Sequence, residues 1–268
     1  MSSPAGSIEK SETIVILDFG SQYAQLIARR VRDSGVYSLL AHPNISADDL
    51  KDINVKGLIF TGGPSSVYED GAPKCRPEML ELGVPILGIC YGMQVSAHLM
   101  GSKVDSCESR EYGRTSLKIT EPDGLLKNIP AETTVWMSHG DQVQKIGEDF
   151  IPLAATPTCP IAAVKHKTRP FYGVQFHPEV THTPHGGEIF TNFLFDICGC
   201  NGLWKMSSFV DAVVADVQSR VGPDEKVICG LSGGVDSSVV AAMLHKAVGD
   251  RLECIFVDNG LLRMNEVE

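Results

Sequence analysis

The sequence predicts an α/β fold: a doubly wound, mostly parallel sheet with an antiparallel extension, followed by the opening of a second α/β unit. Short apolar runs alternate with helical patterns over residues 14–100, as expected for strands buried between two helical layers. Over residues 115–176 the runs are separated by turn residues, which favours antiparallel pairing. After residue 200 the alternation begins again.

The first elements follow from hydrophobic periodicity. Continuous apolar runs predict strands, and apolar residues at helical spacing predict helices, the first of which is ended by Gly35. The expected strands are 14–17, 36–41, 57–61 and 85–89, and the expected helices are 23–31, 77–82 and 93–100. The expected extension has strands at 117–119, 135–137, 162–164 and 172–176 and a helix at 188–197.

The same pattern divides the chain into domains. We expect a first domain over 13–200, a linker over 201–208 and a second domain over 209–268. The second should contain helices at 209–221 and 235–246 and strands at 227–231 and 254–257. So few elements bury little apolar surface, so this piece is expected to be the incomplete N-terminal part of a longer domain.

Composition narrows the function classes. The 268 residues are 43% hydrophobic and 21% charged, as in ordinary globular proteins. The formal net charge of −10 disfavours nucleic acid and anionic membranes as partners. No apolar run approaches the roughly 18 residues needed to span a bilayer. The eight cysteines are scattered, which predicts free thiols and a cytoplasmic location.

A cysteine between glycines is the first candidate for chemistry. Cys90 lies in Gly88-Ile89-Cys90-Tyr91-Gly92, where an apolar strand is expected to turn sharply into a helix. Small neighbours permit this turn, and a helix N-terminus behind the sulfur favours the reactive thiolate. The alternative is a small buried core cysteine. The pattern alone leaves the two readings about equal.

Two further segments favour catalysis. His177 and Glu179 follow an apolar run, where the imidazole could exchange protons and the carboxylate could orient it. Taken without the cysteine, such a pair is more often an exposed ion pair. In Gly62-Gly63-Pro64, after another expected strand, a glycine N–H could face an oxyanion, although alone this segment is merely a turn.

Together, these segments resemble the class I (triad) glutamine amidotransferases over about residues 13–200. The matching motifs are Gly62-Gly63-Pro64, Gly88-Ile89-Cys90-Tyr91-Gly92-Met93-Gln94 and Phe176-His177-Pro178-Glu179. The resemblance implies glutamine hydrolysis through a thioester on Cys90, with His177 as base and acid and Glu179 as its orienter. It also implies an oxyanion hole and a glutamine-binding set. The N–H groups of Gly63 and Tyr91 would form the oxyanion hole. Gln94 and the stretch Ser138-His139-Gly140-Asp141, through Ser138, Gly140 and Asp141, would bind glutamine.

A glycine-rich loop follows the strand expected at 227–231. Because it opens a helix, its N–H groups and the helix dipole would converge on an anion. A Ser/Gly-rich helix cap is the alternative. The loop resembles the pyrophosphate-binding loop of ATP pyrophosphatases, which implies that it binds ATP with Mg²⁺. The implied ATP-binding residues are Ser232, Gly233, Gly234, Val235, Asp236, Ser237 and Ser238.

A triad glutaminase followed by such a loop resembles the GMP synthase family, as does the segment 256–263. The resemblance implies adenylylation of the C2 oxygen of XMP by ATP, followed by displacement of AMP by ammonia from glutamine. It implies a homodimer only for a full-length protein. Because the second domain is expected to be incomplete, we expect the 268-residue chain to fold its glutaminase part without making GMP.

Two alternative functions remain, and one further pattern invites a metal site. The chain could be a non-catalytic module that keeps the fold, which an intact Cys90, His177 and Glu179 disfavour. It could be a triad glutaminase that serves another synthase, which the loop at 232–238 disfavours. Cys198 and Cys200, with two histidines nearby, invite a metal site, but a Cys-x-Cys pair is tighter than usual zinc spacing, so no metal site is expected.

Overall fold

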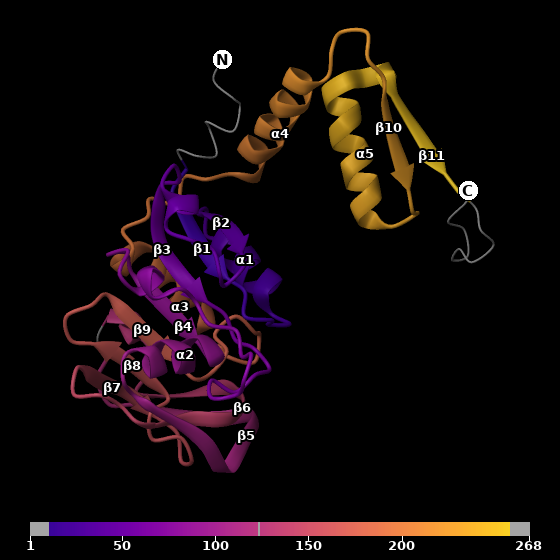
Figure 1. The fold of residues 1–268 in the computed structure, drawn as a ribbon. Coiled ribbons are helices and arrows are strands. Elements are labelled where there is room, and N and C mark those ends of the chain that lie inside the picture. The colour runs from indigo at the N-terminus through magenta and orange to yellow at the C-terminus, as the bar shows by residue number, and fades with distance from the viewer. Residues whose placement is uncertain (1–10, 123, 258–268) are drawn as a thin grey trace. The chain divides into compact units, whose positions relative to one another are not determined.

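The computed structural model describes residues 11–122 and 124–257, and the chain divides into two compact units. The larger unit runs from Ser11 to Trp204, and the smaller one begins at Lys205. Figure 1 shows the helices and strands of both. Each unit is described by itself below.

The larger unit is built on one nine-stranded sheet in the order β2-β1-β3-β4-β9-β8-β7-β5-β6. The first five strands of this order are all parallel to one another. They are β2 (Tyr37–Ala41), β1 (Thr13–Leu17), β3 (Val55–Phe60), β4 (Ile86–Ile89) and β9 (Phe171–Val174). The expected doubly wound, mostly parallel sheet is confirmed.

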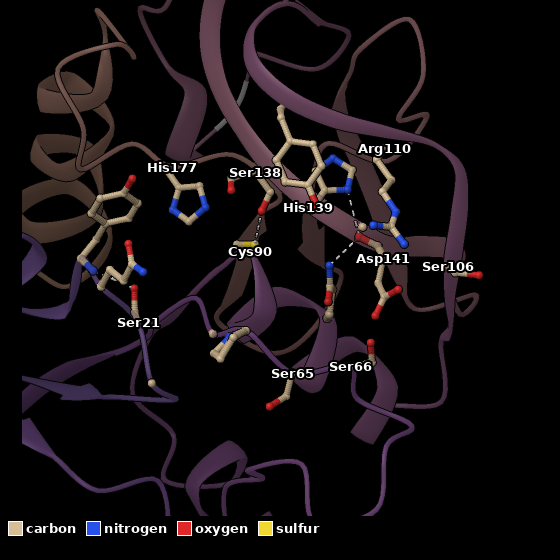
Figure 2. A pocket seen from close by; sticks show the side chains of 18 of the residues that line it. Ser21, Ser65, Ser66, Cys90, Ser106, Arg110, Ser138, His139, Asp141 and His177 are labelled. Atoms are coloured by element: carbon tan, nitrogen blue, oxygen red, sulfur yellow. Dashed lines mark hydrogen bonds between the residues drawn. The ribbon is translucent and has the colours of Figure 1, made fainter.

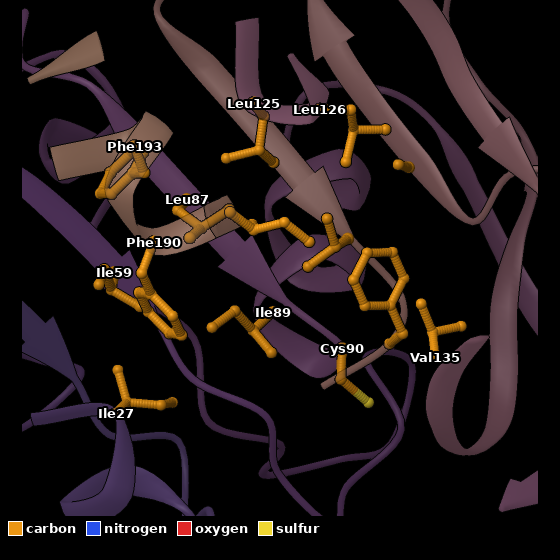
Figure 3. Packing of buried hydrophobic residues seen from close by; sticks show 14 of the residues in the cluster. Ile27, Ile59, Leu87, Ile89, Cys90, Leu125, Leu126, Val135, Phe190 and Phe193 are labelled. Atoms are coloured by element: carbon orange, nitrogen blue, oxygen red, sulfur yellow. The ribbon is translucent and has the colours of Figure 1, made fainter. Parts of the chain in front are cut away.

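Helices cover both faces of the parallel strands. Successive residues of a strand point to opposite faces, so each strand contributes side chains to two apolar clusters. Ile14 and Ile16 pack in one apolar cluster with residues of α1 (Ala24–Asp33) and α3 (Gly186–Thr191). Val15 and Leu17 belong to a second cluster, with residues of α2 (Tyr91–Leu99). Figure 3 shows part of the first cluster, in which Cys90 lies at the edge of the packed side chains. The continuous apolar run of β1 therefore serves two cores.

The antiparallel extension differs in detail from the sequence prediction. It comprises β8 (Ala163–His166), β7 (Phe150–Ala155), β5 (Lys103–Ile119) and β6 (Glu132–Lys145). β5 and β6 form a far longer ribbon than the expected strands at 117–119 and 135–137. Many of their residues are polar and exposed, so only the apolar parts could be recognised as strands from the sequence. β7 was not expected, and the expected last strand, as β9, pairs in parallel with β4 and antiparallel with β8.

Two expected helices also take other forms. The segment Pro77–Leu80 is a short 3₁₀ turn instead of a helix over 77–82. The expected helix at 188–197 begins as α3 and continues as a π-helical segment, Asn192–Ile197. Both segments still bury apolar side chains, including Met79 and Phe193. The sequence located both segments without identifying their backbone hydrogen-bond pattern.

The smaller unit has the expected order of helix, strand, helix and strand. It consists of α4 (Met206–Arg220), β10 (Val227–Leu231), α5 (Val235–Val248) and β11 (Leu252–Phe256), with β10 and β11 parallel. Its strands keep apolar side chains exposed, and Ile228 is 65% accessible. The segment 256–263 extends beyond the described residues after residue 257. Among the described helices, none has the length and apolarity required to cross a bilayer.

Candidate active site

A pocket of about 590 Å³ opens where the carboxyl ends of the parallel strands meet (Figure 2). Segments that follow β1, β3, β4 and β9 contribute to it, and β5 and β6 complete its wall. This edge is where open α/β sheets bind ligands, because the loops after the strands converge there. Cys90 and His177 both line the pocket. The sheet topology thus brings together side chains that are distant in the sequence.

Cys90 occupies a strained turn between β4 and α2. Its φ is 51° and its ψ is −109°. A positive φ is uncommon in residues other than glycine, and residues with this strain cluster at functional sites. The flanking glycines are required for close packing. A Cβ on Gly92 would lie 2.2 Å from the carbonyl oxygen of Phe60, and one on Gly88 would lie 2.7 Å from the backbone nitrogen of Met93. The turn therefore has the local geometry expected of a nucleophile elbow.

His177 and Glu179 form a buried pair. Nδ1 of His177 lies 2.8 Å from Oε1 of Glu179. The backbone of His177 is fixed as well: its N–H donates to the Trp136 carbonyl oxygen at 3.0 Å, and its carbonyl accepts from the Thr183 hydroxyl at 2.7 Å. The imidazole therefore has a defined orientation, with a hydrogen on Nδ1 directed at the carboxylate.

Opposing effects act on the charge of His177. Burial lowers the pKa of the ring, but hydrogen bonds to Cys90 and Glu179 and the charges of both groups raise it to about 10. The other carboxylate oxygen of Glu179, Oε2, is buried and has no hydrogen-bond partner among the described residues. The imidazolium is therefore the main compensation for this buried charge. The arrangement favours a charged ring beside the sulfur.

Of the two residues expected to form an oxyanion hole, one lines the pocket with Cys90 and the other follows Cys90 in the sequence. Gly63 lines the pocket, and Tyr91 is the first residue of α2. A Cβ on Gly63 would lie 2.6 Å from the Phe19 carbonyl oxygen, so the backbone approach there requires glycine. The phenol of Tyr91 donates to the Pro73 carbonyl oxygen at 2.7 Å. The group of Tyr91 next to the nucleophile is therefore its backbone N–H. Their role as oxyanion donors stays a prediction.

The expected glutamine-binding residues Gln94, Ser138, Gly140 and Asp141 all line the pocket. Nε2 of Gln94 donates to the Asp141 carbonyl oxygen at 2.7 Å, and the Asp141 carboxylate accepts from the Tyr68 hydroxyl at 2.9 Å. The carbonyl oxygen of Ser138 lies 3.7 Å from the Cys90 sulfur. These residues therefore line one pocket with Cys90, and a hydrogen bond ties Gln94 to Asp141.

Sequence reasoning missed a second buried pair, His139 and Glu111, of which His139 also lines the pocket. Nε2 of His139 lies 3.1 Å from Oε2 of Glu111, and Oε1 of Glu111 accepts from the hydroxyl groups of Thr156 and Thr158. Nδ1 of His139 lies 3.0 Å from the Asp141 carbonyl oxygen (Figure 2). Glu111 follows an irregularity in β5, where the register against β6 shifts between Ser106 and Glu111. No periodic pattern in the sequence marks this position.

The described residues contain one cluster of possible metal ligands: Glu111, His139 and Cys159. Glu111 and His139 already bond each other, and burial raises the pKa of the Cys159 thiol to about 12. The histidines near the Cys-x-Cys pair have other contacts: the His182 ring lies 4.5 Å from the Trp136 ring, and Nδ1 of His185 lies 3.2 Å from Glu188. Glu111 and the three histidines therefore already have hydrogen-bond or ring contacts.

In the smaller unit, the glycine-rich loop joins β10 to α5 and is closed by serine side chains. The Ser237 hydroxyl accepts from the Ser232 N–H at 3.2 Å, and the hydroxyls of Ser237 and Ser238 both donate to the Gly234 carbonyl oxygen at 3.0 Å. Gly233 has a φ of 79°. Apart from the half-buried Ser237, the residues from Ser232 to Ser238 are exposed. The loop is therefore ordered yet accessible to a ligand.

Comparison with known proteins identifies the larger unit. Residues 15–197 match the family model described as glutamine amidotransferase class-I. The chain belongs to the class-I glutamine amidotransferase family. The match covers every element of the candidate active site, from β1 to the segment that carries His177 and Glu179. Residues 205–257, in the smaller unit, match the family model described as NAD synthase.

Relatives of this glutamine amidotransferase are similar over almost all of the chain. A protein of Bacillus cereus named GMP synthase [glutamine-hydrolyzing] is 51% identical over 260 residues, covering 97% of this chain and 51% of its own length. One of Acetivibrio thermocellus with the same name is 53% identical over 256 residues, covering 96% of this chain and 50% of its own. The chain thus spans about half the length of the curated relatives it matches.

Solved structures support the same fold. A Thermoplasma acidophilum protein, provisionally named as one subunit of a GMP synthase, is 32% identical, with a TM-score of 0.63 over 70% of this chain and 94% of that one. A Thermotoga maritima glutamine amidotransferase, 15% identical, has a TM-score of 0.53 over 90% of this chain and 99% of that one. At that identity, the second likeness concerns the fold alone.

Proposed function

We propose that this chain is the glutamine-hydrolysing part of a GMP synthase. The observation that carries the proposal is the shared pocket of Cys90 and His177, in which a cysteine on a strained elbow faces an imidazole held 2.8 Å from a buried Glu179. The relatives that this chain matches over about half of their length are named GMP synthase, which supports GMP as the product. A cytoplasmic location fits this role, since all eight cysteines are free thiols.

The proposed mechanism begins with attack of the Cys90 thiolate on the side-chain amide carbon of glutamine. The N–H groups of Gly63 and Tyr91 stabilise the oxyanion. His177 gives its Nε2 proton to the leaving nitrogen, so ammonia departs and a thioester remains. His177 then accepts a proton from water as the water attacks the thioester, which releases glutamate and regenerates Cys90. Glu179 keeps the ring oriented throughout.

Substrate binding is assigned to pocket residues from α2 and β6. We propose that Gln94, Ser138, Gly140 and Asp141 bind glutamine. Both hydrogens on Nε2 of Gln94 are engaged, by the carbonyl oxygen of Asp141 and by Gln175, so Gln94 would contact glutamine through its Oε1. The Asp141 carboxylate, which Tyr68 holds in place, is suited to the α-ammonium group of glutamine.

The smaller unit is proposed to be the N-terminal part of an ATP pyrophosphatase domain, with a domain boundary within 201–208. Its exposed loop, from Ser232 to Ser238, would bind the phosphates of ATP at the start of α5. Mg²⁺ would enter with ATP, and Asp236 in the first turn of α5 offers it a carboxylate oxygen. ATP would adenylylate the C2 oxygen of XMP, and ammonia would displace AMP to give GMP. A homodimer is proposed only for the full-length protein.

Two assays test the proposal. The 268-residue chain is incubated with glutamine, and glutamate release and a Cys90 thioester are measured, with the Cys90→Ala variant as control. A polypeptide that carries this chain and extends over the full length of its relatives is assayed for GMP with XMP, Mg-ATP and either glutamine or ammonium. Cys90→Ala should remove only glutamine-dependent GMP formation. Equal loss with ammonium would contradict the division of labour.

A further inference from the structure

A buried glutamine contacts the candidate nucleophile. Gln175 follows β9, is fully buried, and its backbone N–H donates to the Ala162 carbonyl oxygen at 2.8 Å. Its side-chain Nε2 lies 3.5 Å from the Cys90 sulfur and donates to it. The Cys90 N–H in turn donates to the Val174 carbonyl oxygen at 2.8 Å. Adjacent backbone segments therefore hold this amide against the sulfur.

The orientation of the Gln175 amide is set by its other end. Oε1 of Gln175 accepts a hydrogen bond from Nε2 of Gln94 at 3.1 Å, and the same Nε2 donates to the Asp141 carbonyl oxygen at 2.7 Å. Turning the Gln175 amide over would direct its NH₂ group at the NH₂ group of Gln94, so only one orientation satisfies both residues. That orientation directs an N–H at the sulfur.

The far end of this chain of hydrogen bonds is anchored. The Asp141 carbonyl oxygen that accepts from Gln94 also bonds Nδ1 of His139, and His139 is held by the buried Glu111. Chains of buried hydrogen bonds hold their members in one arrangement, because an unpaired polar group in the interior is costly. The amide of Gln175 is therefore preorganised and needs no substrate to position it.

We propose that Gln175 is a catalytic residue of this site, which stabilises the thiolate of Cys90 through a neutral N–H donor, with Gln94 as its positioning residue. The inference rests on the proposed function. His177 must give up its proton to the leaving nitrogen, whereas the Gln175 amide has no proton to lose at these pH values and keeps its bond through the cycle. It favours the thiolate again when the thioester is hydrolysed.

The test measures how readily Cys90 is alkylated by iodoacetamide as a function of pH, with the Cys90 peptide followed by mass spectrometry. Gln175→Glu preserves size and can still accept from Gln94, but presents an oxygen to the sulfur. A hydrogen bond to a charged group shifts an equilibrium roughly tenfold or more, so we expect the pH midpoint of alkylation to rise by about one pH unit. Gln175→Leu should raise it similarly, and Gln94→Leu by less.

Gln144→Glu is the matched control, because it makes the same chemical change at an exposed position on β6, and its profile should equal that of the wild type. Folding of each variant is checked by circular dichroism. An unchanged midpoint in folded Gln175→Glu would overturn the inference. Should both Gln175 variants fail to fold, an unchanged midpoint in Gln94→Leu would overturn it instead.

The same variants separate this inference from the proposed function. If wild type releases glutamate from glutamine, Gln175→Glu should lower kcat about tenfold and change KM less. If wild type releases none, the proposed function fails, and the alkylation profile still decides whether Gln175 stabilises the thiolate.

Discussion

At the scale of single residues, the candidate triad divides its work unequally. The sulfur of Cys90 is the group that would form the covalent bond, whereas Glu179 contacts only His177 among the proposed reacting groups, at 2.8 Å. Removal of the nucleophile or its base abolishes catalysis by a triad, whereas loss of the orienting group leaves partial activity. This ordering is directly measurable.

We expect Cys90→Ala and Cys90→Ser to abolish glutamate release while the fold is retained, and His177→Ala to cost almost as much. Glu179→Gln should keep partial activity, because its amide can still accept from Nδ1 of His177. Steady-state glutaminase rates give the order. A Glu179→Gln variant less active than Cys90→Ser would show that the roles are wrongly assigned.

The charge on His177 should make the site sensitive to alkaline pH. Its pKa is raised to about 10, in part by Glu179, so the Glu179→Gln variant should lose the imidazolium at lower pH than the wild type. The alkaline limb of the pH–rate profile should therefore move down, and so should the NMR titration of the His177 ring. An unshifted titration of the His177 ring would mean that Glu179 does not stabilise the imidazolium.

The same pKa determines how stability varies with pH. A folded-state pKa of about 10 lies above the ordinary value of 6.5, so the stabilisation is complete below pH 6.5 and is lost as pH rises through about 10. The difference in unfolding free energy between wild type and His177→Gln should shrink over that interval. Denaturant titrations at several pH values would measure it, and a growing difference would contradict the sign.

At the scale of elements, the turn between β4 and α2 depends on glycine. A Cβ on Gly92 would lie 2.2 Å from the backbone oxygen of Phe60, which cannot rotate away. We expect Gly92→Ala to lower the free energy of unfolding by about 1–3 kcal/mol and to impair the site. Gly187→Ala is the control, because its Cβ meets nothing within 4 Å in α3. Chemical denaturation should show that variant to be equal or more stable.

A buried hydrogen-bonded pair, Glu111 and His139, joins the long strands β5 and β6. Three groups bond the Glu111 carboxylate: His139, Thr156 and Thr158. Leaving a buried hydrogen-bonding group unpaired costs about 1–3 kcal/mol. Glu111→Gln puts an NH₂ group where a carboxylate oxygen accepts hydrogen bonds, so it should lower the free energy of unfolding by an amount of that order. Glu132→Gln, at the exposed start of β6, should change it little. Equal effects in both variants would contradict a structural role for the pair.

The contrast between β1 and β5 shows what the sequence could predict. β1 is apolar at nearly every position because both of its faces are buried, and such a run is visible without a structure. β5 mixes exposed polar residues with a buried glutamate, so neither its length nor Glu111 could be inferred. Gln175 was hidden for a related reason, because a glutamine within an apolar run signals nothing until its partners Cys90 and Gln94 are known.

At the scale of the whole molecule, both apolar clusters lie within residues 14–200. The larger unit therefore contains its own core, and a chain of residues 1–204 should fold with an unfolding transition like that of the longer chain. Limited proteolysis should cut first within 201–208 and leave a resistant fragment that ends near 200. A chain of residues 1–204 that is unfolded would refute the proposed boundary.

The strand β9 lies between β4 and β8, parallel to one and antiparallel to the other, and the segment after it supplies both Gln175 and His177. Cys90, directly after the neighbouring strand β4, is made much earlier during synthesis. The thiol on a growing chain consequently lacks both partners until residues beyond 177 have left the ribosome and the last parallel strand has inserted. The surroundings of this cysteine are therefore complete only once the last parallel strand has joined the sheet.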